Sequence, residues 1–453
     1  MMKITSSGFR QGHRAWFLAA RFRGLSTAAL GLIAACVLSG CAANYGVPAA
    51  GTMVGTALNG SVHGGQQPIT GATIQLYAAS TTGYSAVATA LLTSSVSSDS
   101  NGNFNITNDY TCPSAATLVY ATSIGGNPGG GTNPNAALMA PLGACGSLTS
   151  STFISVNELT TVAGAFALAP FMSNARSLGT SSTNVTGLTN AFSSVNKLVN
   201  VSLGQSPGTL PTGATAPTSK LNTLGDILAA CINSTGGVAG DGSACGTLFA
   251  NSTPPGGAAP TDTVTAALNI AKYPGSNVTA LANLATAASP FQPTATGLAD
   301  FTLAVKYAPA ATFSTPSASA VDSAGNLWVA NKGNNSITVL SATTALPTIL
   351  TGGTLRAPSS IAFDQNGNAW VPNSGNSTLS VFTPAGAGSL SSATGLSTPT
   401  SIAIDGQNIL WIANSGNSSI TESVVSGTSV SSTNNFSGTA GISGPVGVAI
   451  NAH

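Results

Sequence analysis

The side chains most able to do chemistry in this sequence are its cysteines, its few histidines and a set of regularly spaced aspartates. Six cysteines are present: Cys36, Cys41, Cys112, Cys145, Cys231 and Cys245. No Cys-x-x-Cys pair occurs, and His63 is the only histidine between Cys41 and the C-terminal His453. A zinc site needs several such ligands at close spacing, so we expect no bound metal and no cofactor.

The aspartates Asp322, Asp364 and Asp405 recur at equivalent positions of a repeated segment, which predicts a structural role for each rather than one assembled site. The chain has no Gly-x-Ser-x-Gly elbow, no metal-binding histidine pair and no phosphate-binding loop. Asp226 is expected on the solvated face of a helix, because nothing supplies it with a base or a metal partner. The sequence therefore predicts no catalytic residues.

The four cysteines after Cys41 favour two disulfides, because an even number in an oxidising compartment is typical of bridged proteins. The expected pairing is sequential, since each pair lies inside one compositional block. It joins Cys112 to Cys145 and Cys231 to Cys245.

The first 40 residues have the three parts of a secretory signal: a basic segment to residue 24, an apolar run over residues 25–38 and small residues after it. A run of about 14 residues is short for a membrane span, which needs about 20. The run ends in Leu38-Ser39-Gly40-Cys41, which resembles the bacterial lipobox. The resemblance implies cleavage before Cys41, a diacylglyceryl group on its thiol and a third acyl chain on the new amino group. The alternative is an ordinary signal with an incidental cysteine.

Triacylation of Cys41 would anchor the chain stably, because one acyl chain binds membranes only marginally. Ala42, in place of an aspartate, is compatible with sorting to the outer membrane. Residues 41–55 are expected to form a lipidated tether.

Charge and composition also fit export. Only 5% of residues are charged, compared with about a quarter in ordinary soluble domains. Five of the 12 basic residues precede Cys41 and all 11 acids follow it, so the remaining 7 basic and 11 acidic residues give a net charge of −4. No basic run interleaved with aromatics is present, which excludes nucleic acid as a partner.

Residues 56–154 are expected to form an all-β sandwich. Residues 73–77 alternate with a period of two, and residues 99–104 (DSNGNF) predict a tight turn into a strand. These segments, with Gly60-Ser61-Val62 and residues 68–76 (PITGATIQL), resemble the carboxypeptidase regulatory-like, transthyretin-like sandwich. The resemblance implies a structural or adhesive module.

Residues 155–308 are expected to form a small helical domain. Ser155 or Asn157 can cap a first helix at residues 159–172, whose Glu158 favours the positive end of the helix dipole. Further helices are expected at residues 187–200, 218–232, 261–272 and 277–288, separated by segments rich in Pro and Gly.

Residues 312–453 contain a repeat with a period near 40. Three copies begin at Pro316, Pro358 and Pro399, and a fourth begins at Pro445. Their tryptophans are Trp328, Trp370 and Trp411, which we expect to pack between neighbouring sheets. A period near 40 is typical of a four-stranded propeller blade, and the turns contain Gly or Asn, which tolerate positive φ.

These copies resemble the NHL and streptogramin lyase-like propellers, so the expected fold is mainly β with a helical middle region and a partial β-propeller of three blades and the start of a fourth. That lyase family would imply a catalytic histidine and acidic groups with magnesium, yet His453 is the only histidine here. Propellers close with four to eight blades. Either the array is truncated, which we favour, or another segment or a second copy closes it. Open strand edges would favour self-association.

The function expected from these features is that of a lipid-anchored cell-envelope protein that binds an envelope protein or a glycan without catalysis. The alternatives are a propeller-based lyase or hydrolase with unusual site chemistry, and a purely structural envelope protein.

Overall fold

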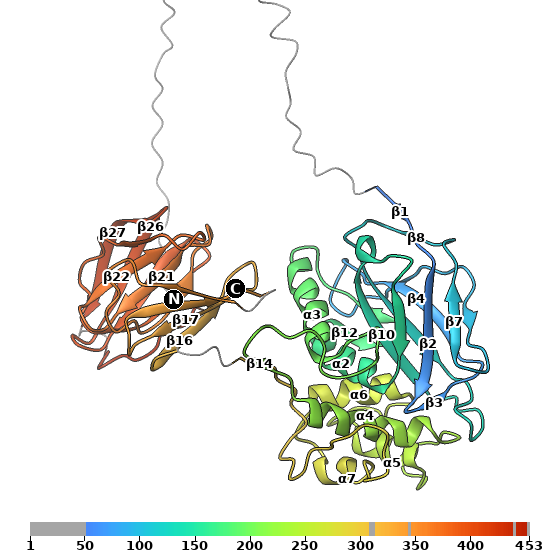
Figure 1. Cartoon of the computed structure of the whole chain (residues 1–453). Coiled ribbons are helices and arrows are strands. Elements are labelled where there is room, and N and C mark those ends of the chain that lie inside the picture. Colours follow the sequence, from blue (N-terminus) through green and yellow to red (C-terminus); the bar gives the residue numbers. More distant parts are fainter. Residues whose placement is uncertain (1–50, 308–312, 343–345, 438–440, 451–453) are drawn as a thin grey trace, which may run out of the picture. The chain divides into compact units, whose positions relative to one another are not determined.

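The protein is described from a computed structural model that covers residues 51–307, 313–342, 346–437 and 441–450. The leader, Cys36, Cys41, Ala42 and His453 lie outside the described residues. Along the chain, strands come first, then helices, then strands again, and strands contain more residues than helices (Figure 1). The fold is therefore mainly β with a helical middle region, as the sequence predicts.

The first strands form a two-sheet sandwich. One sheet has the order β10 (Ala137–Ala144), β9 (Leu118–Ile124), β4 (Thr73–Ala78) and β5 (Thr89–Ala90), with β6 (Val96–Ser97) also paired to β4. In the other, β2 (Leu58–Gly64) pairs with β3 (Gln67–Pro68), β7 (Asn103–Ile106) and, in parallel, β11 (Phe153–Val156). The inward side chains of both sheets share one core.

Local sequence explains these strands. Ile74, Leu76 and Ala78 of β4 are buried and alternate with more exposed residues, which is the period of a half-buried strand. The predicted turn is present: Asp99 Oδ1 accepts hydrogen bonds from the backbone N–H groups of Asn101 and Asn103, both 2.8 Å long. The chain then enters β7.

The tether is shorter than predicted. β1 (Met53–Val54) pairs with β8 (Thr111–Cys112), and Gly55 N donates to the carbonyl of Tyr110. The first paired strand therefore begins at Met53 and not after residue 55. A short uncharged segment without clear periodicity can still pair with a sheet edge.

The middle region has six α-helices among the described residues: α2 (Glu158–Leu168), α3 (Val185–Leu198), α4 (Thr218–Ile232), α5 (Ala244–Asn251), α6 (Thr263–Lys272) and α7 (Val278–Ala282). Asn157 caps α2, its side chain accepting from Thr160 N, whereas Ser155 lies in β11. The α4 range equals the predicted one, and α5 was not predicted. Short elements connect them: η1 (Cys145–Ser147), η2 (Ala169–Phe171), β12 (Met172–Asn174), β13 (Ser177–Leu178), β14 (Ala214–Thr215) and β15 (Lys306–Tyr307).

The helices do not form the separate small domain that the sequence predicts. α2, α3 and α6 pack against β10 (Figure 1). One hydrophobic core extends from Leu58 of the sandwich to Phe301 after the helices. The expected boundary between residues 154 and 155 falls inside β11. The reason is that α2 is buried over nearly its whole surface, which requires the sheet on one side and other helices around it.

Hydroxyl groups on these helices also cover the free edge of β10. Met139 N donates to Thr161 Oγ1 of α2 at 2.9 Å, and Ala137 N donates to Thr263 Oγ1 of α6 at 3.0 Å. Edge strands expose unpaired backbone groups, and here the helices supply their partners. The sandwich and the helices are thus one structural unit.

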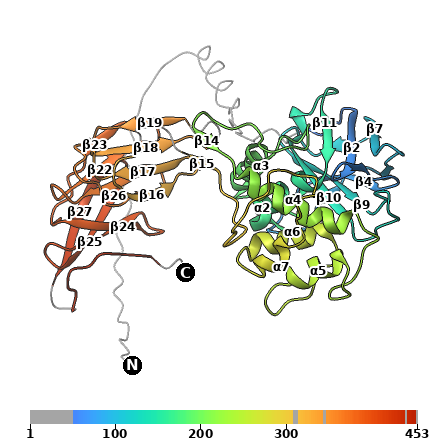
Figure 2. The same cartoon turned by 60° about the horizontal axis from the view of Figure 1, so that its bottom comes forward.

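The C-terminal residues form three antiparallel four-stranded sheets (Figure 2). The first blade has β16 (Pro316–Val321), β17 (Leu327–Asn331), β18 (Ser336–Leu340) and β19 (Pro347–Leu350). The second has β20 (Ala362–Phe363), β21 (Ala369–Asn373), β22 (Thr378–Phe382) and β23 (Gly388–Leu390). The third has β24 (Pro399–Ile404), β25 (Ile409–Asn414), β26 (Ser419–Ser426) and β27 (Ser429–Ser437).

The same hydrogen bond joins each blade to the next. The hydroxyl of Ser317 donates to Pro358 O at 2.6 Å, and that of Ser359 donates to Pro399 O at 2.7 Å. The Thr400 hydroxyl donates to Pro445 O at 3.0 Å. The start of the fourth copy therefore contacts the third blade in the way that each blade contacts its predecessor.

Candidate functional site

The repeated aspartates hold the turns and indole rings of their own blades. Asp322 Oδ1 accepts from the backbone N–H groups of Ala324 and Asn326, and its Oδ2 accepts from Trp328 Nε1 at 2.9 Å. The second and third blades repeat the indole bond, from Trp370 to Asp364 at 2.9 Å and from Trp411 to Asp405 at 3.1 Å.

The electrostatics fit this structural role. Partial burial would raise the pKa of Asp322, but hydrogen bonds from the Trp328 indole, Asn326 and the turn amides outweigh it and lower the pKa. The pKa of Asp405 is lowered in the same way, against the effect of burial. A carboxylate whose two oxygens accept from its own turn is a poor proton carrier for a reaction.

The tryptophans take the packing position that the sequence predicts in two of the three blades. Trp328 belongs to a core cluster with Ile361 and Val371 of the second blade, and its ring lies edge-on to Phe363 at 5.5 Å. Trp370 belongs to a second cluster with Ile412 of the third blade. Trp411 is only partly buried, and its ring stacks on Phe436 of its own blade at 6.2 Å.

A repeated buried asparagine was not singled out from the sequence. The side-chain amides of Asn331, Asn373 and Asn414 donate to hydroxyls of the next strand, with distances of 2.9, 2.8 and 2.7 Å to Thr338, Ser380 and Thr421. In the sequence, this asparagine could have been found because it stands three residues after the tryptophan in each copy of the repeat. Each blade therefore has a polar centre that is internally satisfied.

Both disulfides have the predicted pairing. Cys112 of β8 is bonded to Cys145 of η1, which directly follows β10, and Cys231 of α4 is bonded to Cys245 of α5. Nearby, the Asn133 amide donates to the carbonyls of Cys231 and Ile232 at 2.8 and 3.1 Å. The second bridge thus joins the end of α4 to α5, and the Asn133 amide joins the same end to the sandwich.

The prediction for Asp226 is wrong. Its side chain is fully buried: Oδ1 accepts from Phe291 N at 2.9 Å, while Oδ2 has no hydrogen-bond partner. Burial raises its pKa to about 6. The cause is the segment around Phe291, which covers this face of α4, and sequence periodicity cannot reveal such a distant segment.

Glu158 is a second buried carboxyl group. Its Oε1 accepts from Gly65 N at 2.8 Å, and Oε2 has no partner. Burial raises its pKa to about 8, and the neighbouring Asp226 adds to this shift. The sequence predicted a favourable interaction with the helix dipole, but the buried side chain holds a proton at neutral pH. Neither carboxyl group is exposed, so neither can contact a substrate in solution.

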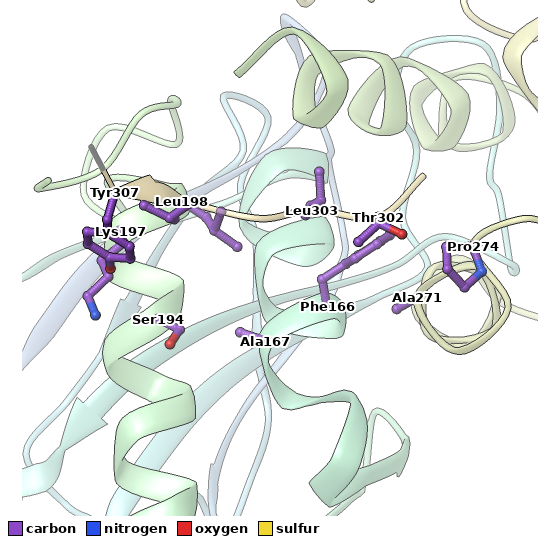
Figure 3. Close-up of a pocket in the computed structure, with 11 residues that line it drawn as sticks. Phe166, Ala167, Ser194, Lys197, Leu198, Ala271, Pro274, Thr302, Leu303 and Tyr307 are labelled. Carbon is purple, nitrogen blue, oxygen red and sulfur yellow. The ribbon is translucent and has the colours of Figure 1, made fainter. Parts of the chain in front are cut away.

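The candidate binding site is a cavity of about 370 Å³ between three helices. Figure 3 shows α2 contributing Phe166 and Ala167, α3 contributing Ser194, Lys197 and Leu198, and the segment with Thr302, Leu303 and Tyr307 crossing over them. Among the described residues, its lining is mainly apolar, with three hydroxyls and one lysine and without a carboxylate, histidine or cysteine. Such a lining is typical of ligand pockets and lacks an acid–base pair for catalysis.

Among the described residues, no group of three or more His, Cys, Asp or Glu side chains could hold a metal ion. No helix in this part of the chain combines the length and the apolar character that crossing a bilayer requires.

No known family model matches the chain, and no curated protein matches it. Among solved structures, a streptogramin B lyase is similar at 21% identity, over 32% of this chain and 48% of that chain, with a TM-score of 0.29. A virginiamycin B lyase from Staphylococcus aureus gives the same identity, coverage and TM-score. Kuenenia stuttgartiensis hydrazine synthase is similar at 17% identity, over 30% of this chain and 39% of that one, with a TM-score of 0.26. The chain thus spans about half the length of the two lyases.

Proposed function

We propose that this chain is a lipid-anchored protein of the bacterial cell envelope, with a non-enzymatic binding role for its sandwich and its blades. The anchor is supported by the leader and by the order Leu38-Ser39-Gly40-Cys41. We place the protein at the outer membrane because Ala42, and not an aspartate, follows the lipidated position.

The two disulfides support export. Disulfides persist in oxidising compartments and are rare in the cytosol, where thiols are kept reduced. Both bridges of this chain lie after Cys41, in the part that would cross the inner membrane.

The observation that carries the binding role is that the repeated carboxylates already accept hydrogen bonds from their own blades. Asp322, Asp364 and Asp405 each accept from a tryptophan indole and from their own turn, so they serve the fold of the blades. The cavity of Figure 3 supports the same conclusion, because its apolar lining suits a bound molecule better than an acid–base reaction.

The types of module in the chain support a partner in the cell envelope. The sandwich resembles carboxypeptidase regulatory-like modules and the blades resemble NHL-type propellers in their repeated residues. Both kinds of module present loops at the ends of strands, which are common positions for binding residues. The proposed partner is an envelope protein or a glycan.

The anchor is tested by metabolic labelling with radioactive palmitate in cells that produce the full chain. The wild type and Cys36→Ala, the matched control, should be labelled and should fractionate with the outer membrane. Cys41→Ala should be unlabelled and should lose its membrane fraction. An unlabelled wild type, or label retained in Cys41→Ala, would contradict the proposal.

A further inference from the structure

A second cavity, of about 450 Å³, lies at one end of the first sheet of the sandwich. It is formed by the end of β4 and the loop after it, by the loop before β9 and by the first turn of α3. This volume lies within the range of about 300–1,000 Å³ that is typical of ligand pockets. The cavity of Figure 3 has a different lining and shares no residue with it.

The floor of this cavity is apolar and firmly packed. Ala78 of β4, Leu118 of β9 and Leu188 of α3 line it, and all three are buried. Two strands and a helix therefore fix the floor, and a ligand would meet a preformed apolar surface.

The rim is rich in hydroxyl groups, from Ser80, Thr81, Thr82, Thr89, Ser114 and Thr117. Two pairs hold each other in place: Ser80 with Thr82 at 2.9 Å, and Ser114 with Thr117 at 3.1 Å. Thr81 and Thr89 are exposed and make no side-chain hydrogen bond within the described residues. Each hydroxyl can donate one hydrogen bond and accept two, so the rim can pair with donors and acceptors alike.

No charged side chain lines this cavity in the described part of the chain. An ionic ligand would lose hydration on entering it and would gain no counter-ion, which is costly. The lining therefore favours a neutral molecule that combines apolar faces with many hydroxyl groups.

Tyr84 is an exposed aromatic residue on the loop after β4, next to the rim in sequence but not among the residues that line the cavity. Tyr84 is 54% exposed, although its ring stacks on Phe171 at 5.7 Å with an interplanar angle of 14°. Its hydroxyl also accepts from the side-chain amide of Asn184 at 2.7 Å. Tyr84 follows Thr82 by two residues and Asn184 precedes Val185, both of which line the cavity. The ring is thus held in place while much of it stays open to a ligand.

We infer that this cavity binds a short neutral oligosaccharide. The sugar ring presents its C–H groups to Tyr84 and to the apolar floor, and its hydroxyls exchange hydrogen bonds with Thr81 and Thr89. This inference rests on the proposed binding role and assigns it a site and a ligand class. A competing occupant is an extended peptide that adds to β5, the edge strand that contains Thr89.

The test uses the full lipidated protein in a zwitterionic detergent, because detergents with sugar headgroups would compete. Maltotriose and chitotriose are the neutral probes, sialyllactose is the charged probe, and a short uncharged peptide of alternating Thr and Val represents the strand. Saturation-transfer NMR titration measures binding of each. At least one neutral trisaccharide should bind, whereas sialyllactose and the peptide should not.

Variants locate the site. Tyr84→Ala should weaken binding about two- to tenfold, the range expected for an aromatic contact. Thr89→Val, which keeps the shape of the side chain, should weaken it measurably, and Thr89→Asp should abolish it. Tyr273→Ala and Thr73→Val are matched controls, because both residues are exposed and neither lines the cavity.

Three results would overturn the inference: no binding of either neutral trisaccharide, equal or tighter binding of sialyllactose or the peptide, or trisaccharide binding that Tyr84→Ala and Thr89→Val leave unchanged. Palmitate labelling of the same protein is independent of these outcomes. A labelled protein that binds no neutral sugar would refute the ligand class and leave the envelope anchor intact.

Discussion

At the scale of single residues, five of the 11 acidic residues show two contrasting environments. Asp322, Asp364 and Asp405 each accept hydrogen bonds from their own turn and from a tryptophan indole. These hydrogen bonds lower the pKa of Asp322 and of Asp405. Glu158 and Asp226 are buried, and each has one oxygen without a partner, which favours the protonated form. A buried carboxyl group of the second kind makes stability depend on pH.

Glu158→Gln should therefore flatten the pH dependence of unfolding. Because burial raises the pKa of Glu158 to about 8, the folded state keeps a proton that the unfolded chain releases above about pH 4.5. The free energy of unfolding of the wild type should fall as pH rises between these values, whereas glutamine does not titrate. Chemical denaturation at pH 5 to 8 measures both slopes. The variant should be more stable than the wild type by a few kcal/mol at the upper end.

A variant that keeps the wild-type slope would contradict this assignment. Asp226→Asn gives a second check, because burial raises the pKa of Asp226 to about 6 and its effect should be complete at a lower pH.

At the scale of elements, hydroxyl groups on helices supply hydrogen-bond partners for the edge strand of the sheet. β10 is an edge strand, and Thr161 and Thr263 from two helices accept from its N–H groups. The helices thus contribute to the sheet as partners in hydrogen bonding and not only as apolar cover.

Thr161→Val should lower the free energy of unfolding by about 1–3 kcal/mol, because Met139 N–H would be buried without a partner. Thr189→Val is the matched control, since Thr189 is exposed on α3 and bonds only within its helix. Denaturant midpoints compare the two. Equal effects of both substitutions would show that the hydroxyl of Thr161 does not stabilise β10.

The two disulfides should contribute unequally to the free energy of unfolding. They close loops with sequence separations of 33 and 14 residues, for which chain entropy predicts about 4 and about 3 kcal/mol. Cys112→Ala with Cys145→Ala should therefore destabilise more than Cys231→Ala with Cys245→Ala in thermal unfolding. Reducing agent should lower the melting temperature of the wild type, and a variant lacking both bridges should not respond to it.

At the scale of the whole molecule, the two described parts of the chain are stabilised in different ways. In residues 51–307 the chain builds one core from strands and helices that are distant in sequence. In residues 313–450 it repeats one blade, and each blade contacts its neighbours through the same hydroxyl and tryptophan positions. The stability of a repeat array is close to a sum of units and interfaces.

Trp370→Ala should therefore destabilise both the second and the third blade. This fully buried ring packs between the second and third blades, and its loss should cost about 3–5 kcal/mol. Hydrogen exchange should rise in both blades. Trp411→Ala, at a partly buried position, should cost less and should act within the third blade. Identical exchange patterns in the two variants would contradict this description.

The sequence by itself determined what depends on short stretches of chain. The three blades, the turn at Asp99, the α4 range and the pairing of the cysteines were predictable, because strand alternation, helix periodicity and turn residues act between near neighbours. The packing of Trp328 and Trp370 followed from the repeat for the same reason.

Only the tertiary structure decided which groups lie buried or together. Asp226 is buried by a segment 65 residues further along the chain, and Glu158 by a turn 93 residues before it. The hydroxyl-rimmed cavity joins residues 78–82 and 89, 113–118 and 185–188, and the helices share a core with the sandwich. The physical reason is that burial depends on which surfaces meet, and a local pattern specifies that a face is apolar without specifying what covers it.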